Sequence, residues 1–136
     1  TGDSMGAIYG EFTSDGSQTR NFFLTSSGKM MLDQYNPSGG SLLGNEIVNT
    51  NQWVHVAYVQ SGSNRKIYVN GKLDVEDNAA ETFSGSTPTV ARIGRRGPAS
   101  EAYSYNGQID DLRLYTYPLS AEQIGQIMNE GHVVSL

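Results

Sequence analysis

Two adjacent carboxylates, Asp110 and Asp111, interrupt the otherwise apolar stretch YNGQIDDLRLY. Carboxylates can act as acid and base in hydrolysis, and they also supply oxygen ligands for cations. In a regular strand, however, neighbouring side chains point to opposite faces, so this pair is a poor acid/base couple. The sequence therefore favours a structural role or a cation ligand over catalysis at this pair.

The same stretch breaks the alternation expected of a strand, since Ile109 and Leu112 have opposite parity. One extra residue at the Asp pair, a β-bulge, would return Ile109, Leu112 and Leu114 to a common face. A bulge is compatible with a bound Ca2+, because bulges re-aim side chains and Ca2+ takes about six to eight oxygen ligands. We therefore predict a bulge, and we name Asp110 and Asp111 as the metal-ligand candidates.

A second pair of carboxylates, Asp74 and Glu76 in LDVED, shares one parity and so one face. Glycosidases need two carboxylates about 5 to 9.5 Å apart across a cleft. This pair directly follows a turn and has no neighbouring aromatic cluster on which a sugar could stack. A solvated strand face explains it better, and we expect no enzymatic activity.

Sugar recognition combines an aromatic platform with planar polar side chains. The most informative loop is GRRGPASEAYSY, where two arginines stand near two tyrosines in an acidic chain. The predicted ligand-binding residues are Arg95, Arg96, Tyr103 and Tyr105 in this loop, with Tyr35 and Asn36 in another. A solvated turn with its tyrosines packed on a strand is the competing interpretation.

Composition restricts the remaining classes of function. The 136 residues carry a net charge of -5, and the nine Lys and Arg are scattered, which argues against nucleic acid as a partner. No apolar run approaches the roughly 20 residues that span a bilayer. The absence of cysteine excludes disulfides and thiol chemistry. The two histidines, His55 and His132, are too few for a His-rich metal centre.

Short segments separated by turn signals predict an all-β protein. The expected strands cover residues 7–12, 20–25, 29–35, 42–48, 53–60, 89–94 and 103–115, with a hairpin over 65–77. WVHVAYVQ is apolar on both parities, which is typical of a central strand covered on both faces. We expect Trp53, which opens this strand, to lie in the core.

Two local motifs have a defined geometry. Asn70-Gly71 is the favoured two-residue hairpin turn, and it would place Val69 opposite Lys72. After Pro118 the period changes, and LSAEQI predicts a short amphipathic helix whose capping box is formed by Ser120 and Gln123. Gly131 is the expected C-cap of that helix.

Three stretches in order, NQWVHVAYV, IYVNGKL and IGRRG…YNGQIDDLRLYTYPLSAEQI, resemble the laminin-G-like, concanavalin-A-like jelly rolls, in particular the bacterial LamG-type modules. The matched positions include Trp53, His55, Tyr68 to Gly71, Gly107, Ile109 to Tyr115, Leu119 and Ser120. The resemblance implies a concanavalin-A-like jelly-roll sandwich of two antiparallel sheets with one short C-terminal helix, forming a single domain over residues 1–136.

The resemblance further implies an extracellular or cell-surface binding module for glycans or protein ligands, often with calcium near the rim. Carbohydrate recognition or adhesion is the expected function. A protein-interaction or structural module is the alternative, and a hydrolase or lyase of the same fold ranks last. The family's N-terminal strands have no counterpart before TGDSMGAIYGEF, so we also expect exposed sheet edges that could pair with another chain or form a strand-exchanged homo-oligomer.

Overall fold

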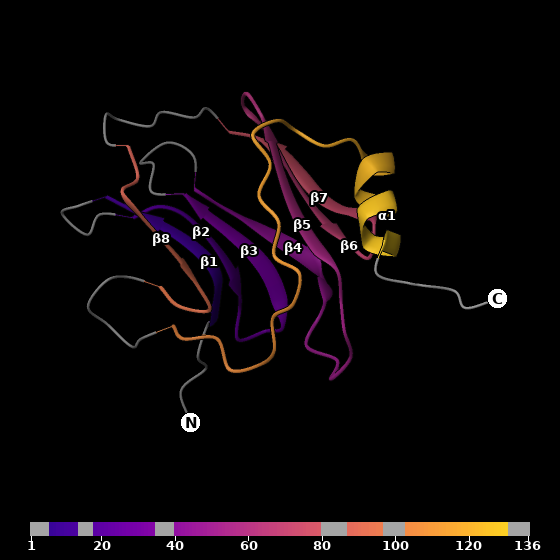
Figure 1. Cartoon of the computed structure of the whole chain (residues 1–136), viewed down its shortest axis with the longest axis horizontal. Helices are drawn as coiled ribbons and strands as arrows, with labels where there is room; N and C mark the ends of the chain where they lie inside the picture. Colours follow the sequence, from indigo (N-terminus) through magenta and orange to yellow (C-terminus); the bar gives the residue numbers. More distant parts are fainter. Residues whose placement is uncertain (1–5, 14–17, 35–39, 80–86, 97–102, 131–136) are drawn as a thin grey trace.

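The computed structural model describes residues 6–13, 18–34, 40–79, 87–96 and 103–130. It shows two antiparallel β-sheets packed face to face and one helix near the C-terminal end (Figure 1), which confirms the predicted fold class. The predicted residues Tyr35 and Asn36, His132 and the expected helix cap Gly131 lie outside the described residues.

The larger sheet has five strands in the order β4-β3-β2-β1-β8. Their bounds are β1 Gly6–Phe12, β2 Gln18–Leu24, β3 Lys29–Gln34, β4 Ser41–Ile47 and β8 Val90–Ile93. Each lies within two residues of its predicted position. The buried Met30 and Leu32 alternate with more exposed neighbours along β3, as a strand with one covered face requires.

The smaller sheet has three strands in the order β5-β6-β7, with β5 Val56–Ser61, β6 Asn64–Val69 and β7 Lys72–Asn78. Asn70 and Gly71 connect β6 to β7 with φ values of 49° and 76°, the left-handed conformation that the predicted turn requires. Val69 lies opposite Lys72, as expected.

The main core lies between the sheets. It is formed by Phe22, Met30, Leu32 and Leu42 of the larger sheet and Ile67 of the smaller one, with Ile8, Leu24, Val48, Val56, Tyr58 and Val75 packed against them. Burying apolar side chains contributes about 1.5 to 3 kcal/mol each, so these residues supply most of the force that joins the two layers.

Polar contacts join the two sheets on the side where β7 faces β4. The Asp74 carboxylate accepts hydrogen bonds from the backbone amides of Asn45 (2.9 Å) and Glu46 (3.0 Å), and the Asn45 side chain donates to the Asp74 carbonyl. A carboxylate that satisfies two strand amides leaves β4 with fewer unpaired donors at its edge. On this side the sandwich is closed.

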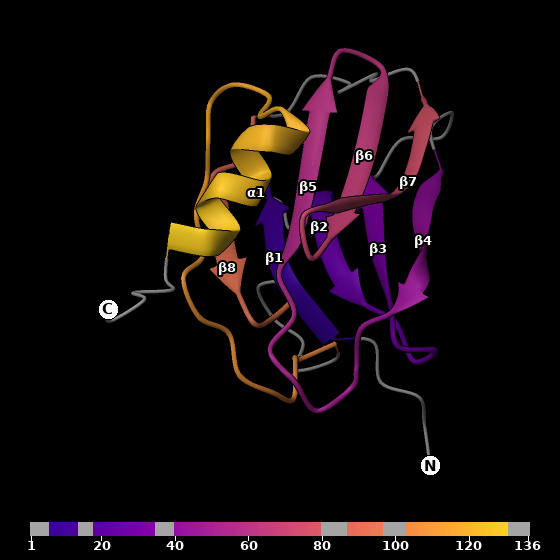
Figure 2. The same cartoon turned by 90° about the vertical axis from the view of Figure 1, so that its right-hand side faces the viewer.

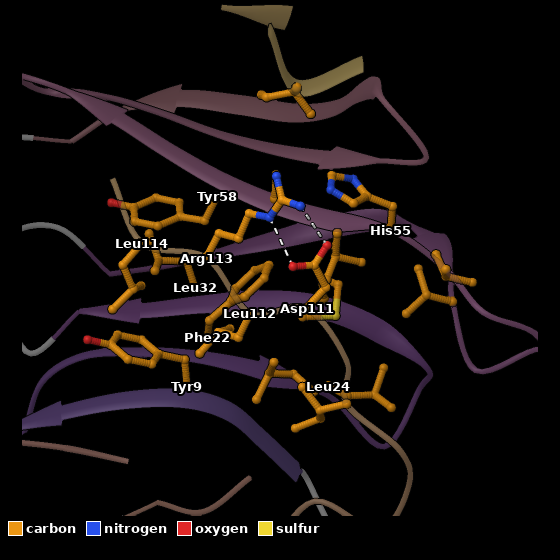
Figure 3. A pocket seen from close by; sticks show the side chains of 18 of the residues that line it. Tyr9, Phe22, Leu24, Leu32, His55, Tyr58, Asp111, Leu112, Arg113 and Leu114 are labelled. Atoms are coloured by element: carbon orange, nitrogen blue, oxygen red, sulfur yellow. Dashed lines mark hydrogen bonds and ion pairs between the residues drawn. The ribbon is translucent and has the colours of Figure 1, made fainter. Parts of the chain in front are cut away.

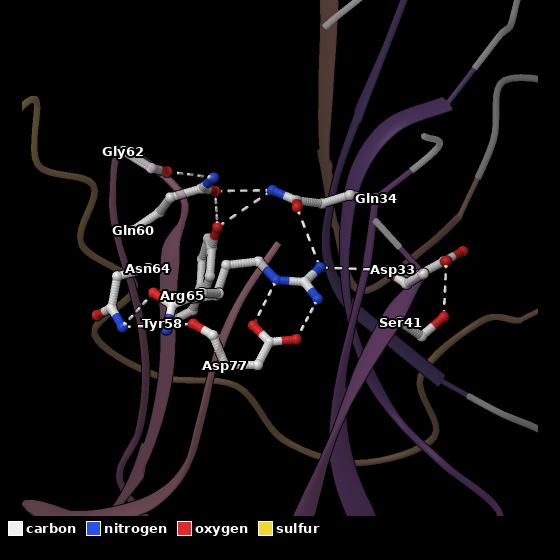
Figure 4. A network of polar contacts seen from close by, with 11 residues as sticks. Asp33, Gln34, Ser41, Tyr58, Gln60, Gly62, Asn64, Arg65 and Asp77 are labelled. Carbon is white, nitrogen blue, oxygen red and sulfur yellow. Dashed lines mark hydrogen bonds and ion pairs between the residues drawn. The ribbon is translucent and has the colours of Figure 1, made fainter. Parts of the chain in front are cut away.

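Arg65 on β6 is fully buried at 0% exposure, and Figure 4 shows its polar contacts. Its guanidinium donates Nε to Asp77 Oδ1 (2.8 Å) and also binds Asp77 Oδ2. The Nη1 group donates across the core to Gln34 Oε1 (3.2 Å) and to the Gly40 carbonyl (3.0 Å). Gln34 in turn donates to Gln60 Oε1 (2.7 Å). These contacts tie β3 to β5, β6 and β7.

The helix, α1 Ala121–Glu130, begins as predicted. Gln123 Oε1 accepts from the Ser120 amide (2.8 Å) and Ser120 Oγ accepts from the Gln123 amide (3.2 Å), which is the reciprocal capping box. Figure 2 shows α1 beside the smaller sheet, and Ile124 is its buried residue.

Four expectations about the strands next to α1 are wrong. The paired strand starts at Val56 rather than at residue 53, and β5 is the edge of its sheet rather than a central strand. Trp53 is 67% exposed instead of buried in the core. Residues 105–115 form no strand, and the 103–115 region contains only an isolated bridge between Ser104 and Ala7. The edge position of β5 and the absence of a strand over 105–115 have one physical reason: β5 and the 105–115 segment do not pair with each other.

Replacement of Arg65 by Ala should destabilise the domain by about 3 kcal/mol, because it leaves the Asp77 carboxylate and Gln34 without their charged donor. Lys66→Ala is the matched control, since Lys66 pairs with Glu76 at a partly exposed position and such pairs contribute about 0 to 1 kcal/mol. Urea unfolding of both variants measures the difference. Equal losses would show that the buried network does not join the sheets.

Candidate functional site

The Asp pair adopts a kinked backbone without a bulge, since a bulge needs a paired strand. Asp111 has a φ of 50°, and its amide donates to Asp110 Oδ1 (2.8 Å). Aspartate tolerates this left-handed conformation better than most residues because its side chain bonds locally. The kink lies at the place where the sequence alternation breaks.

Asp111 forms a bidentate ion pair with Arg113. The Arg113 Nε donates to Asp111 Oδ1 (2.9 Å), and the Arg113 Nη2 donates to Asp111 Oδ2 (3.0 Å). The hydrogen bonds from Arg113 hold the pKa of Asp111 below its usual value. Arg113 also binds Glu130 in the last turn of α1, a turn that carries no basic residue of its own. The pair therefore places a cation at the C-terminal end of the helix dipole.

Both Asp111 oxygens are thus already engaged by a guanidinium, and a Ca2+ ion would have to displace it. Across the described residues, no group of three or more His, Asp or Glu side chains gathers in a way that could hold a metal. Calcium binding through Asp110 and Asp111 stays a prediction that this geometry does not favour.

The predicted sugar-binding residues separate into two places. Arg96 lies with its guanidinium carbon 4.6 Å from the Tyr103 ring centroid and 5.4 Å from that of Phe23. Phe23 is 1% exposed and Tyr103 is 36% exposed. Arg95 is half-buried next to Arg96. We call Arg96 and Tyr103, together with the underlying Phe23, the arginine–tyrosine patch.

Backbone hydrogen bonds hold this patch in place. The Tyr103 carbonyl accepts from the Ala7 amide of β1 (2.9 Å), and the Tyr105 amide donates to the Gly94 carbonyl (2.9 Å). Tyr103 itself has a φ of 65°, a conformation that costs energy for a tyrosine and persists only where surrounding contacts fix it. The patch therefore sits on the larger sheet through β1 and the end of β8.

Tyr105 belongs elsewhere. Its ring packs so closely against Gly6 and Gly107 that an added Cβ at either glycine would collide with it, and it lines an open groove instead of the patch. Of the six predicted ligand-binding residues, the structure therefore brings together Arg96 and Tyr103, and Arg95 is the sequence neighbour of Arg96.

The groove has a volume of about 1040 Å³ and runs between β5 and the 105–115 segment (Figure 3). Its lining includes Ile8, Phe22 and Leu24 of the larger sheet, Val56 and Tyr58 of β5, and Leu112 and Leu114 of the segment. Leu112 is 37% and Leu114 is 66% exposed. In the sequence, the apolar residues on both faces of β5 predicted that other elements cover both faces of this strand. The described residues do not supply this cover, and the groove lies there instead.

His55 stands at the rim of the groove beside the Asp111–Arg113 pair, as Figure 3 shows. Its amide donates to Asn70 Oδ1 (3.0 Å), and its ring atom Nδ1 is buried without a hydrogen-bond partner among the described residues. Burial lowers the pKa of His55 below its usual value; the field of Asp111 opposes this shift and that of Arg113 adds to it.

A family profile described as "Concanavalin A-like lectin/glucanases superfamily" (Laminin_G_3) matches residues 1–125. The chain belongs to this family. The predicted resemblance to laminin-G-like modules is thereby confirmed, and the family comprises binding modules as well as enzymes. Comparison with curated protein sequences gives no match.

Among solved structures, the laminin-G-like chain is similar to an S-layer domain-containing protein from Clostridium thermocellum (residues 221–444). The two are 26% identical with a TM-score of 0.50, and the match covers 93% of this chain and 64% of that chain. The chain thus spans less than two thirds of the length of that structure. Among the described residues, no helix has the length and apolar character needed to cross a bilayer.

Because the folded protein holds the pKa of His55 below the value of about 6.5 expected in the unfolded chain, the unfolded state binds the proton more readily. The stability that this site contributes is complete above about pH 6.5 and is lost as the pH falls through the folded pKa. We expect His55→Gln to flatten the dependence of the melting temperature on pH between about 7 and 5. An unchanged slope in the variant would contradict the assignment.

Proposed function

We propose that this laminin-G-like domain is a non-catalytic recognition module that works outside the cell or at its surface and binds carbohydrate. The family description names lectins, and the similar solved structure is an S-layer domain-containing protein. Fold alone does not specify a ligand, so the proposal depends on the chemistry of the arginine–tyrosine patch.

The observation that carries the proposal is the stacking of Arg96 on Tyr103 above a buried phenylalanine. A guanidinium that lies over an aromatic ring is held in place by the cation–π attraction, and its planar fork of donors suits hydroxyl and carboxylate oxygens. The partly exposed tyrosine offers an apolar surface for the C–H face of a sugar ring. Positive charge at this place in a chain of net charge -5 favours an acidic glycan.

The carboxylates support a non-catalytic role. Asp74 binds two backbone amides of β4, and Glu76 pairs with Lys66 at 3.5 Å, so both members of the predicted carboxylate pair have structural partners. Asp111 is bound by Arg113 and Asp77 by Arg65. A glycosidase needs one carboxyl group to carry a proton and the other to stay ionised across a substrate cleft.

The test is a glycan array probed with the wild-type domain and with the triple variant Arg95→Ala, Arg96→Ala and Tyr103→Ala, each in the presence and absence of calcium. We expect the triple variant to lose about tenfold or more in affinity, which corresponds to about 1.4 kcal/mol. Tyr117→Ala, which removes an exposed tyrosine outside the patch, should bind like the wild type.

Melting curves must accompany the array, because Arg96 covers the buried Phe23 and its removal is expected to lower stability. Equal glycan binding by the folded triple variant and the wild type would contradict the patch. Loss of all binding on calcium removal, with the triple variant unaffected, would assign recognition to the Asp110 and Asp111 region instead. Release of sugar from a polysaccharide would contradict the non-catalytic role.

A further inference from the structure

The larger sheet has a second face, which points away from the smaller sheet (Figure 1). An added Cβ at Gly10 of β1 would lie 2.6 Å from Asn21 Oδ1 and 2.9 Å from the Phe12 ring, so these three residues share one face. Their neighbours Tyr9 and Glu11 in β1 line the groove on the opposite face. We call the side that carries Gly10, Phe12 and Asn21 the outer face.

The arginine–tyrosine patch belongs to this outer face. Phe23 follows Asn21 by two residues in β2, and strand residues two apart point to the same side. The Phe23 and Tyr103 rings lie 6.3 Å apart between centroids, and the Arg96 guanidinium lies over both rings. The proposed glycan site is therefore separate from the groove.

Arg92 of β8 lies on the same face as the patch. In the register of β8 with β1, Arg92 is the direct partner of Gly10, and directly paired residues point to the same side of a sheet. Gly10 contributes no side chain at this position. The next residue across the sheet is Asn21, which pairs with Gly10 on its other side.

The side chain of Arg92 carries an unsatisfied donor. Its Nε group is buried and has no hydrogen-bond partner among the described residues. By contrast, Arg65 and Arg113 each bind a carboxylate of this chain. Arginine stays charged in proteins, and a buried charged donor without an acceptor costs free energy. The Arg92 guanidinium therefore has donor capacity for an anion that comes from outside the described chain.

The outer face is also positively charged. Lys29 and Asp33 point to this face of β3, because the alternate positions of that strand are the ones buried between the sheets. Over the described parts of β1, β2, β3 and β8, Asp33 is the one carboxylate on the outer face, and it accepts a hydrogen bond from Ser41 (3.0 Å). In a chain of net charge -5, Lys29, Arg92 and Arg96 thus make this face attractive to anions.

We propose that Arg92 is a second anion-binding residue of the glycan site, and that the ligand is an acidic oligosaccharide with carboxylates on separate sugar units. This inference rests on the proposed function, in which Arg96 on Tyr103 binds one carboxylate. Arg92 binds the other, since the planar fork of an arginine suits a carboxylate. Two strand spacings, about 10 Å, separate Arg92 from the strand of Phe23. A single uronic acid has one carboxylate and cannot occupy both positions.

The probes are the monomers and tetramers of galacturonic acid and of mannuronic acid, titrated into the 136-residue domain. The methyl esters of both tetramers are the matched neutral ligands, because they keep the sugar chain and lose its charge. We expect at least one tetramer to bind about tenfold or more tightly than its monomer, and its methyl ester to lose about tenfold or more in affinity.

Arg92→Gln should weaken the tetramer by about tenfold and change the affinity of the monomer by less than about twofold, whereas Arg96→Gln should weaken both. Lys66→Gln is the matched control, since it removes a cation from the smaller sheet, where Lys66 pairs with Glu76. It should leave both affinities unchanged. Without ligand, Arg92→Gln should not lower the melting temperature, because the Nε group has no partner to lose.

Tetramer binding that is insensitive to Arg92→Gln would overturn the inference, and so would a methyl ester that binds as tightly as the acid. Preference for a sulfated dextran over both uronic acid tetramers would contradict the carboxylate assignment. A fall of several degrees in the melting temperature of Arg92→Gln would show that Arg92 serves the fold instead. Each of these results leaves the glycan site at Arg96 and Tyr103 in place, whereas failure of every glycan to bind would overturn both proposals.

Discussion

Arg65 places a positive charge at the end of the core with no exposure to solvent, and the arrangement of both sheets depends on how that charge is satisfied. Burying an unpaired guanidinium would cost several kcal/mol, so its partners must be held in place. Asp77 supplies the counter-charge from the neighbouring strand, and Gln34 and the Gly40 carbonyl supply acceptors from the opposite layer. The requirement to satisfy one side chain thus fixes the distance and register between the sheets, and the Asp74 contacts to β4 reinforce it.

Closure on this side leaves the opposite side open. Three strands anchored to β3 and β4 cannot also cover β1 and β8, so β5 ends the smaller sheet where the groove begins. The Asp111–Arg113–Glu130 contacts hold the 105–115 segment to α1, and no strand ladder joins this segment to β5. The domain therefore offers two surfaces of different chemistry: a cationic aromatic patch on the larger sheet and an apolar groove with a strand edge.

Local patterns predicted the local structure well. The Asn70-Gly71 turn, the Ser120 capping box and the alternation in β3 each depend on residues close in sequence, and the structure confirms all three. The errors concern partners that are distant in sequence. WVHVAYVQ has the composition of a central strand, but whether a strand is central depends on its neighbours, and Trp53 is exposed for the same reason. The stacking of Arg96 on Phe23 and the burial of Arg65 were likewise not predictable, because each needs the relative placement of segments that no local pattern specifies.

The central claim is that the sandwich is closed at the Arg65 side and open at the β5 side, and the rate of thiol modification tests it directly. The chain contains no cysteine, so one cysteine introduced by substitution reports on a single position. The two positions to compare are Leu24 in the groove floor and Ile67 in the closed core. The account predicts that the thiol of Leu24→Cys reacts rapidly with a small disulfide reagent under native conditions, while that of Ile67→Cys reacts only after unfolding. Equally slow reaction at both positions would show that the groove is closed in the free protein and would contradict the account.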